Sequence, residues 1–191
     1  MTTFSWKRKA GQNVSRDISC KFEANAQPET LANEAFLQQF KRKRKGEEEN
    51  RKKKCEELKG EGVRLAQLNR FHEAVAEFDK ALLLIPDEKI LEMRAQALLE
   101  LDIPFPAVQS AEKATKLNPR FWEAYQTLGR SQLGIGDLQM AKSSFSKAIH
   151  VNPIEKELWD DLKWTIKLKH DKEELVSETT NTEQGPKPYT I

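Results

Sequence analysis

The strongest constraint on this chain is a pattern of small residues, alanines and prolines that occurs three times along it. The small residues are Gly62, Ala95 and Gly129, the alanines are Ala74, Ala107 and Ala141, and the prolines are Pro86, Pro119 and Pro153. The three prolines lie 33 and 34 residues apart. An interval of about 34 residues is typical of a pair of helices that is repeated along a chain.

Elementary packing explains why these residue types stand at these positions. A small residue lets the backbones of two helices approach closely, and large apolar residues at spacings of three and four fill the rest of the contact. Proline ends the second helix of each pair because it lacks an amide hydrogen and clashes with the preceding turn. One helical hairpin cannot bury its apolar face alone, so we predict that the three hairpins stack side by side.

The second copy departs most from the pattern. Arg94 stands where leucine is usual, and Ala111 stands where both other copies carry phenylalanine. Pro104 and Pro106 crowd the start of its second helix. The first turn of a helix tolerates proline, so we expect these two residues to delay the helix rather than to break it.

Charge and composition divide the chain into an arm, a body and a tail. Residues 1–54 hold 14 Lys or Arg against 7 Asp or Glu, residues 55–170 hold 16 against 18, and residues 171–191 hold 2 against 5. Apolar residues are 38% and charged residues 32% of the chain, which predicts that part of it is unfolded. We predict a basic, largely disordered arm over 1–54 with one short helix over 31–40, repeats over about 55–88, 88–121 and 122–155, a capping helix over 155–169, and a flexible tail over 171–191.

The predicted capping helix has apolar residues on two sides. At about 100° per residue, four of them fall on the side that suits packing on the last hairpin. These four are Leu158, Trp159, Leu162 and Ile166. Trp164 and Leu168 fall on the other side. Either the tail or the arm covers these two residues, or they form an exposed contact patch for a partner or a second copy.

Two basic clusters stand close together before the first repeat. They consist of Lys41, Arg42, Lys43, Arg44 and Lys45, and of Arg51, Lys52, Lys53 and Lys54. Two such clusters with a short spacer are typical of a nuclear-import signal or of a nucleic-acid contact. The acidic residues 47–49 would repel phosphates, and no aromatic residues are interleaved for base stacking, which disfavours nucleic acid. The run also fits a solvated segment without a function of its own.

The residue types that carry enzyme chemistry are scattered along the chain. His72, His150 and His170 lie far apart without the spacing of a metal site, and neither Cys20 nor Cys55 has a base beside it. No stretch approaches the roughly 20 apolar residues of a membrane helix. We therefore expect an intracellular, non-catalytic protein without cofactor, metal or membrane contact, in which both cysteines stay reduced.

The three copies resemble the tetratricopeptide-repeat superfamily over residues 55–170. That resemblance implies an all-α fold, namely a right-handed superhelix of three tetratricopeptide-repeat helical hairpins plus a C-terminal capping helix, and a scaffold with a concave groove for ligands. The chain also resembles one particular family within the superfamily, at residues 4–9, Gly11, Val14, Ser15, 105–108, Trp122, Glu123 and 127–134. The chain departs from this family at its end: we expect members of the family to continue with a longer acidic tail, whereas this sequence stops soon after the capping helix.

The geometry of the first helix of each hairpin predicts which residues line the groove. They are Lys59, Val63, Gln67, Glu92, Gln96, Glu123, Gln126 and Arg130. Charges of both signs and several amides suit an extended or helical peptide of mixed polarity. The alternative is that these side chains are solvated surface residues.

Some tetratricopeptide domains hold the C-terminal carboxylates of heat-shock proteins with lysine, arginine and asparagine side chains. The matching positions here are Lys59, Val63, Met93, Glu123 and Gln126, of which only Lys59 agrees. A carboxylate would be desolvated beside Val63 and Met93 without gaining donors, and Glu123 would repel it. We therefore predict that this chain forms no such carboxylate clamp.

The residues as a whole favour an interaction scaffold or adaptor that is nuclear or shuttles between nucleus and cytoplasm. It would bind peptide segments of partner proteins through the repeat groove. The alternative class is a nucleic-acid-associated protein that uses the basic arm, with the repeats recruiting partners. The identity of the partner proteins does not follow from these residues.

Overall fold

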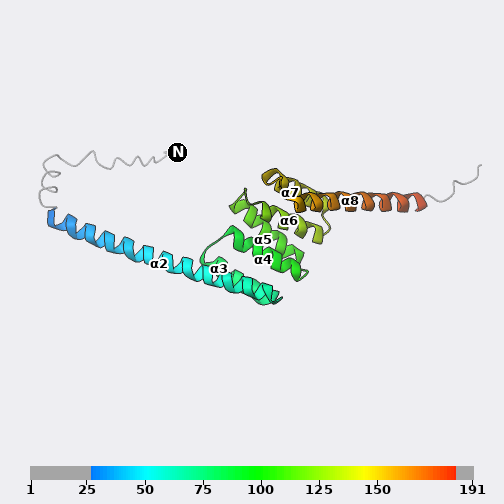
Figure 1. Cartoon of the computed structure of the whole chain (residues 1–191). Coiled ribbons are helices and arrows are strands. Elements are labelled where there is room, and N and C mark those ends of the chain that lie inside the picture. The colour runs from blue at the N-terminus through cyan, green and yellow to red at the C-terminus, as the bar shows by residue number, and fades with distance from the viewer. Residues whose placement is uncertain (1–26, 184–191) are drawn as a thin grey trace, which may run out of the picture. The chain divides into compact units, whose positions relative to one another are not determined.

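The computed structural model describes residues 27–183, and this part of the chain forms seven α-helices without a strand (Figure 1). The helices are α2 (Gln27–Gln67), α3 (Phe71–Leu84), α4 (Glu88–Glu100), α5 (Pro104–Leu117), α6 (Trp122–Gly134), α7 (Leu138–Val151) and α8 (Lys156–Glu183). The chain divides into two units, residues 1–50 and residues 51–191. The repeats belong to the second unit.

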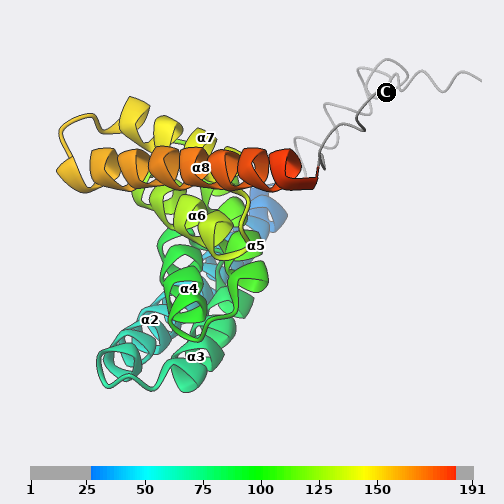
Figure 2. The same cartoon turned by 90° about the vertical axis from the view of Figure 1, so that its right-hand side faces the viewer.

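Three helical hairpins stack in the second unit, as the sequence predicts. The C-terminal part of α2 pairs with α3, α4 pairs with α5, and α6 pairs with α7, while α8 packs on the last hairpin. Figure 2 shows the successive hairpins and α8 running across α6 and α7. The predicted fold of three stacked hairpins and a closing helix is confirmed.

The small residues bring the two helices of a hairpin together. A Cβ atom on Gly62 would lie 2.5 Å from Cε1 of Phe78, and one on Gly129 would lie 2.7 Å from Cε1 of Phe145. Both phenylalanines are fully buried. In the second hairpin two alanines, Ala95 and Ala111, take the equivalent positions and are also fully buried. The small residue on the first helix therefore makes room for the ring on the second.

Each turn between the two helices of a hairpin contains one residue with positive φ. These residues are Asn69 (φ 59°), Asp102 (φ 57°) and Gly136 (φ 78°). Glycine adopts this left-handed conformation freely, and asparagine and aspartate tolerate it better than most residues. The three turns are thus built alike although their sequences differ.

The start of α5 corrects one prediction. Pro104 is the first residue of the helix, at the position equivalent to Phe71 of α3 and Leu138 of α7, so the helix is not delayed. A proline at the first helical position lacks an amide hydrogen that would have no partner there, and its fixed φ suits the helix. Pro106 also lies in the first turn of α5. An amide hydrogen there would have no carbonyl partner within the helix, so the missing hydrogen breaks no hydrogen bond.

Arg94 on α4 connects the second helix of the first hairpin with the second helix of its own hairpin. Its Nε lies 2.6 Å from Oδ1 of Asp79 on α3, and its Nη1 donates to Oγ of Ser110 on α5 at 2.5 Å. The hydroxyl of Ser110 in turn donates to the carbonyl of Pro106. A residue that breaks the repeat pattern therefore forms a polar bridge between α3 and α5.

Helix α2 is much longer than the short helix predicted over 31–40. It runs without interruption over 41 residues, from Gln27 to Gln67. Its charged stretch lacks apolar periodicity, but lysine, arginine and glutamate have high helix propensity, and pairs such as Lys45 with Glu49 add local support. Residues 41–54, which were expected to be disordered, are therefore helical.

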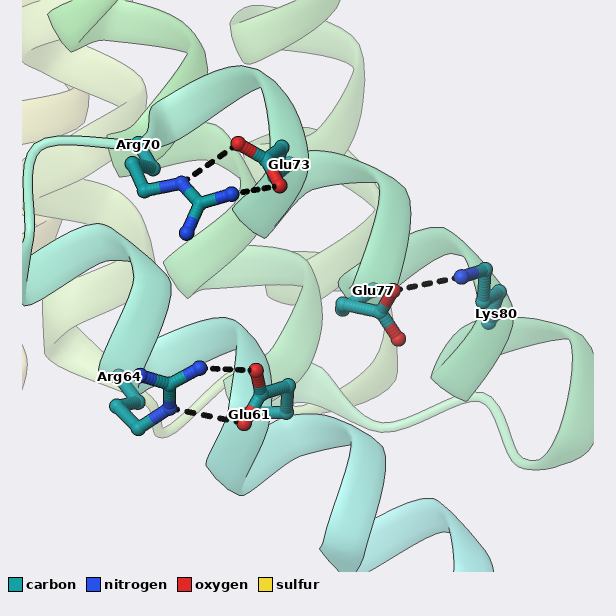
Figure 3. A network of polar contacts seen from close by, with 6 residues as sticks. All are labelled: Glu61, Arg64, Arg70, Glu73, Glu77 and Lys80. Carbon is teal, nitrogen blue, oxygen red and sulfur yellow. Dashed lines mark hydrogen bonds and ion pairs between the residues drawn. The ribbon is translucent and has the colours of Figure 1, made fainter.

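The first hairpin also carries local ion pairs on its surface (Figure 3). They join Arg64 with Glu61, Arg70 with Glu73, and Lys80 with Glu77, in each case over three residues. The hydrogen bonds from Arg64 hold the pKa of Glu61 below its usual value. Because each pair joins residues only three apart in the sequence, it supports the local conformation and not the packing between helices.

Helix α8 is longer than predicted and turns a different face inward. It extends to Glu183, where residues 171–191 were expected to be flexible. Leu158 and Thr165 are buried and Leu162 packs on the last hairpin, but Trp159 and Ile166 are 43% and 46% exposed, so their predicted burial is wrong. Thr165 tolerates burial because its hydroxyl donates to the carbonyl of Asp161 at 2.7 Å.

Candidate functional site

A cavity of about 650 Å³ opens between the first helices of the three hairpins. Its lining residues come from α2, the turn after it, α3, α4 and α6, and they are Val63, Ala66, Gln67, Asn69, Phe71, Phe78, Met93, Gln96, Ala97, Leu99, Glu100, Thr127 and Arg130. All three repeats therefore contribute to one concave surface. This surface is called the concave groove below.

The fold places one residue of each repeat in the concave groove by the same rule. Val63, Gln96 and Arg130 each follow directly after the small residue that faces the second helix of the hairpin. A step of one residue turns a helix by about 100°, so these side chains point away from the hairpin contact. Apolar Val63 lies at one end of this row and charged Arg130 at the other.

Glu92 lies beneath the groove in a buried polar network. Its Oε1 accepts hydrogen bonds from Nε2 of Gln96 at 2.5 Å and from Oγ1 of Thr127 at 2.7 Å. Burial raises the pKa of this carboxyl, and the two hydrogen bonds partly oppose that effect. Glu92 is only 6% exposed, so it joins α4 to α6 and does not face a ligand.

Helix α8 supplies the partners of Arg130. The guanidinium lies 2.9 Å from Oδ2 of Asp161 and 3.6 Å from Oε2 of Glu157. The same Oδ2 atom accepts a hydrogen bond from Nε2 of Gln126 at 2.9 Å. The charge at the third-repeat end of the groove is thereby neutralised from within the chain.

The structure separates the eight residues predicted to line the groove into two sets. Val63, Gln67, Gln96 and Arg130 line the cavity. Lys59, Glu92, Glu123 and Gln126 do not. Glu92 and Gln126 are buried in contacts with the next helix along the stack, and Nζ of Lys59 lies 2.9 Å from Oε1 of Glu56.

Thr127 is a groove residue that the prediction missed. It stands two residues before Gly129, as Met93 stands two residues before Ala95, and both line the cavity. The prediction used positions three residues before the small residue, which are Lys59, Glu92 and Gln126, whereas an offset of two residues would have selected Met93 and Thr127. Phe71, Leu99 and Glu100 lie at helix ends, where a rule based on the middle of the first helix could not find them.

The five positions that match the carboxylate clamp hold few free donors. Val63 and Met93 line the cavity with apolar side chains. Lys59 pairs with Glu56, and the amide of Gln126 donates to Asp161. Glu123 contributes a negative charge. A carboxylate placed here would meet one lysine that is already paired.

The basic clusters lie on α2. Residues 41–45 and 51–54 are all exposed. Lys45 lies 3.9 Å from Glu49, a weak pairing between two exposed side chains. These basic side chains are therefore available to solvent, whatever they bind.

The two residues of the predicted contact patch on α8 differ in environment. Trp164 is 55% exposed, whereas Leu168 is half-buried. Leu168 follows Leu158, Leu162 and Thr165 along the inward face of the helix. Of the two residues predicted to form the contact patch, Trp164 is therefore the more exposed.

A group of potential metal ligands lies on α8. The side chains of His170, Asp171 and Glu174 bring ligand atoms within 4.8 Å of one another, and all three are exposed. Nδ1 of His170 is 3.5 Å from Oε1 of Glu174. Neither His72 nor His150 belongs to such a group in the part of the chain that the structure describes. Over residues 27–183, no helix is both long enough and apolar enough to cross a membrane.

The stacked hairpins and the groove between their first helices define a tetratricopeptide-repeat protein. The family profile described as tetratricopeptide repeat matches residues 123–155. The first tetratricopeptide domain of Spaghetti (RPAP3), solved with the HSP90 peptide SRMEEVD, superposes with a TM-score of 0.60 at 21% identity over 62% of this chain and 94% of that one. The Sgt2 domain of Aspergillus fumigatus gives a TM-score of 0.57 at 21% identity, over 72% of this chain and 88% of that one.

Two curated relatives define the family more closely. Tetratricopeptide repeat protein 33 of Mus musculus is 43% identical over 192 residues, which cover 97% of this chain and 73% of the relative. Its Homo sapiens counterpart is 39% identical over 100% of this chain and 74% of the relative. The chain belongs to the tetratricopeptide repeat protein 33 family.

Proposed function

We propose that this chain is a non-catalytic scaffold that binds a peptide segment of a partner protein in its concave groove. The observation that carries the proposal is the cavity of about 650 Å³, to which all three repeats contribute side chains. A cavity of this size that combines apolar side chains with polar groups fits a ligand site. Tetratricopeptide domains generally mediate protein binding.

The lining residues indicate what kind of peptide the groove accepts. Val63, Phe71 and Met93 offer an apolar surface for one large apolar side chain of the ligand. The amides of Gln67 and Gln96 stand nearby and can hydrogen-bond to a peptide backbone. A segment of mixed polarity with an apolar anchor fits these groups.

An acidic peptide terminus fits the concave groove poorly. Arg130 is the cation that lines the cavity, and Asp161 and Glu157 already occupy it. A ligand carboxylate would have to displace both of these groups. We therefore propose that the chain forms no carboxylate clamp, although the first tetratricopeptide domain of Spaghetti (RPAP3), a structural neighbour, was solved with an HSP90 peptide.

Selection of peptides from a displayed random library, followed by isothermal titration with the full chain, tests the proposal. The selected peptides should carry a large apolar residue, and Met93→Glu should abolish their binding. Lys142→Glu, an exposed change on α7 outside the cavity, should leave binding unchanged. A peptide ending in Glu-Glu-Val-Asp should not bind. Selected peptides that bind Met93→Glu as tightly as the wild type would refute the groove as the site.

A second proposal concerns the basic side chains of α2. We infer that residues 41–45 and 51–54 form a two-part nuclear-import signal, because all nine side chains are exposed. Alanine at residues 41–45 in a fluorescent fusion should move the protein out of the nucleus. The alternative, a nucleic-acid contact, predicts RNA or DNA binding that weakens steeply with salt and is lost when residues 41–54 are neutralised.

A further inference from the structure

A second groove lies between the second helices of the first two hairpins, α3 and α5. Its volume is about 660 Å³, and α4 forms its floor. The lining residues are Asp79, Leu82, Leu83, Pro86, Leu91, Arg94, Pro106, Gln109, Ser110, Lys113, Lys116 and Leu117. We call it the α3–α5 groove. None of its residues lines the concave groove, so it is a separate surface.

Arg94 gives this groove a polar end. Its guanidinium bonds Asp79 on one wall and Ser110 on the other. The third repeat has Leu128 at the equivalent position, and that leucine is buried. Arg94 therefore places a charged bridge where the third repeat has a buried leucine.

The other end of the groove is apolar and exposed. Leu83 is 87% exposed and Leu117 is 51% exposed, and they stand on opposite walls near the C-terminal ends of α3 and α5. Pro86, in the connection between α3 and α4, and Leu91, on α4, also line the groove. Large apolar side chains gathered at a groove and exposed to this degree are typical of a protein contact.

The charge of the groove is positive. Lys113 and Lys116 line its α5 wall, one turn apart. Arg94 already pairs with the carboxylate of Asp79. Nζ of Lys116 lies 3.9 Å from Oε2 of Glu112, which is a long distance for an ion pair. Both lysines thus remain able to pair with carboxylates of a ligand that covers the adjacent leucines.

We propose that the α3–α5 groove binds an acidic amphipathic helix of a partner protein. The two helical walls and the helical floor form a trough that one further helix fills by ordinary helix packing. Leucines of the ligand helix at spacings of three and four residues cover Leu83, Pro86 and Leu117. Glutamates beside them reach Lys113 and Lys116. The basic rim excludes a basic helix.

A designed peptide tests this proposal with the full chain. The probe is a fluorescein-labelled helical peptide with leucine at i, i+3, i+4 and i+7 and glutamate at the flanking positions, and binding is followed by fluorescence anisotropy. Leu83→Ser should weaken binding roughly tenfold, because the leucine loses its apolar contact with the ligand. Lys113→Glu with Lys116→Glu should weaken it at least as much. A peptide with lysine in place of glutamate should bind that double variant and not the wild type.

Matched variants separate this groove from other surfaces. Lys142→Glu with Lys147→Glu makes the same change of charge on α7, at exposed positions outside the groove, and should leave binding unchanged. Met93→Glu in the concave groove should also leave it unchanged, so this test and that of the concave groove can fail independently. Equal binding by the wild type, Leu83→Ser and the double variant would overturn the proposal. A lack of binding by the wild type would also overturn it. Self-association that Leu83→Ser abolishes would overturn it as well, because the groove would then bind a second copy of the chain.

Discussion

The ring of Phe145 occupies the space that a side chain on Gly129 would need. A Cβ atom on Gly129 would lie 2.7 Å from both Cε1 and Cζ of the ring, closer than such atoms approach in proteins. The first hairpin repeats the relationship between Gly62 and Phe78. In the second hairpin an alanine stands at both positions, so the small and large residues change together.

Gly129→Ala should destabilise the protein although alanine is the better helix former. Overpacking of a tight contact costs about 1–3 kcal/mol, and the higher helix propensity of alanine returns up to about 1 kcal/mol. Phe145→Ala should cost about 3–5 kcal/mol through the cavity that it leaves. The double variant, which copies the second hairpin, should cost less than the sum because the new methyl group enters that cavity. Urea denaturation of the four proteins measures the coupling.

Gly60→Ala provides the matched control for a glycine in a helix. A Cβ atom at Gly60 meets nothing within 4 Å. The substitution should therefore stabilise the protein by up to about 1 kcal/mol through helix propensity alone. If Gly129→Ala proved as stabilising as Gly60→Ala, the close approach of Gly129 and Phe145 would be wrong.

Glu92→Gln should change how stability depends on pH. Burial raises the pKa of Glu92 in the folded state, so folding favours the protonated carboxyl. The stabilisation from this group is complete below the unfolded pKa of about 4.5 and is lost as the pH rises through the folded pKa. A neutral glutamine keeps the acceptor for Thr127 and Gln96 and avoids this loss. Unfolding in urea should show the variant to be more stable than the wild type near pH 7 and the two to converge near pH 4.

Convergence at low pH is the part of the Glu92 prediction that distinguishes it from a simple packing effect. A change in packing would shift stability by a similar amount at each pH. A variant that was less stable than the wild type near pH 7 would show that the charged carboxylate stabilises the α4–α6 contact.

Asp161→Ala should loosen α8. The substitution removes the carboxylate that accepts hydrogen bonds from both Arg130 and Gln126. We expect the free energy of unfolding to fall by about 1–3 kcal/mol. The lower end applies because the Arg130 side chain is 46% exposed and solvent screens its charge. Amide hydrogen exchange in α8 should become faster. Asp160→Ala, which removes an exposed carboxylate 3.3 Å from Lys163, should have almost no effect. Similar effects of the two variants would mean that the Asp161 contacts do not hold the helix.

Cys55 should react with thiol reagents only when the first hairpin opens. Its side chain is buried and its Sγ lies 3.6 Å from the carbonyl oxygen of Ala81. Burial raises the pKa of the thiol, and the nearby carboxylates of Asp87 and Glu56 raise it further, so little thiolate forms. In a Cys20→Ser variant, labelling with a maleimide should be slow in buffer and rapid in urea. Rapid labelling in buffer would show that α2 separates readily from α3.

The sequence predicted the repeats because their packing is encoded locally. A small residue such as Gly62 or Gly129 is needed wherever two helices approach closely. The proline after each hairpin ends its second helix wherever it stands. The groove residues Val63, Gln96 and Arg130 follow from the same rule, since each comes directly after the small residue. Helix α2 escaped the prediction because its charged stretch has helix propensity without apolar periodicity.

Tertiary structure decided what periodicity left open. Thr165 is buried and Ile166 is exposed, and Thr165 tolerates burial because its hydroxyl donates to the backbone carbonyl of Asp161. Gln126 is buried because α8 brings it the carboxylate of Asp161, whereas Thr127 at the groove donates to the carboxylate of Glu92 on α4. The sequence by itself determined three hairpins and their contacts, which depend on residue size. Only the fold determined which polar side chains remained free, because that depends on partners from distant parts of the chain.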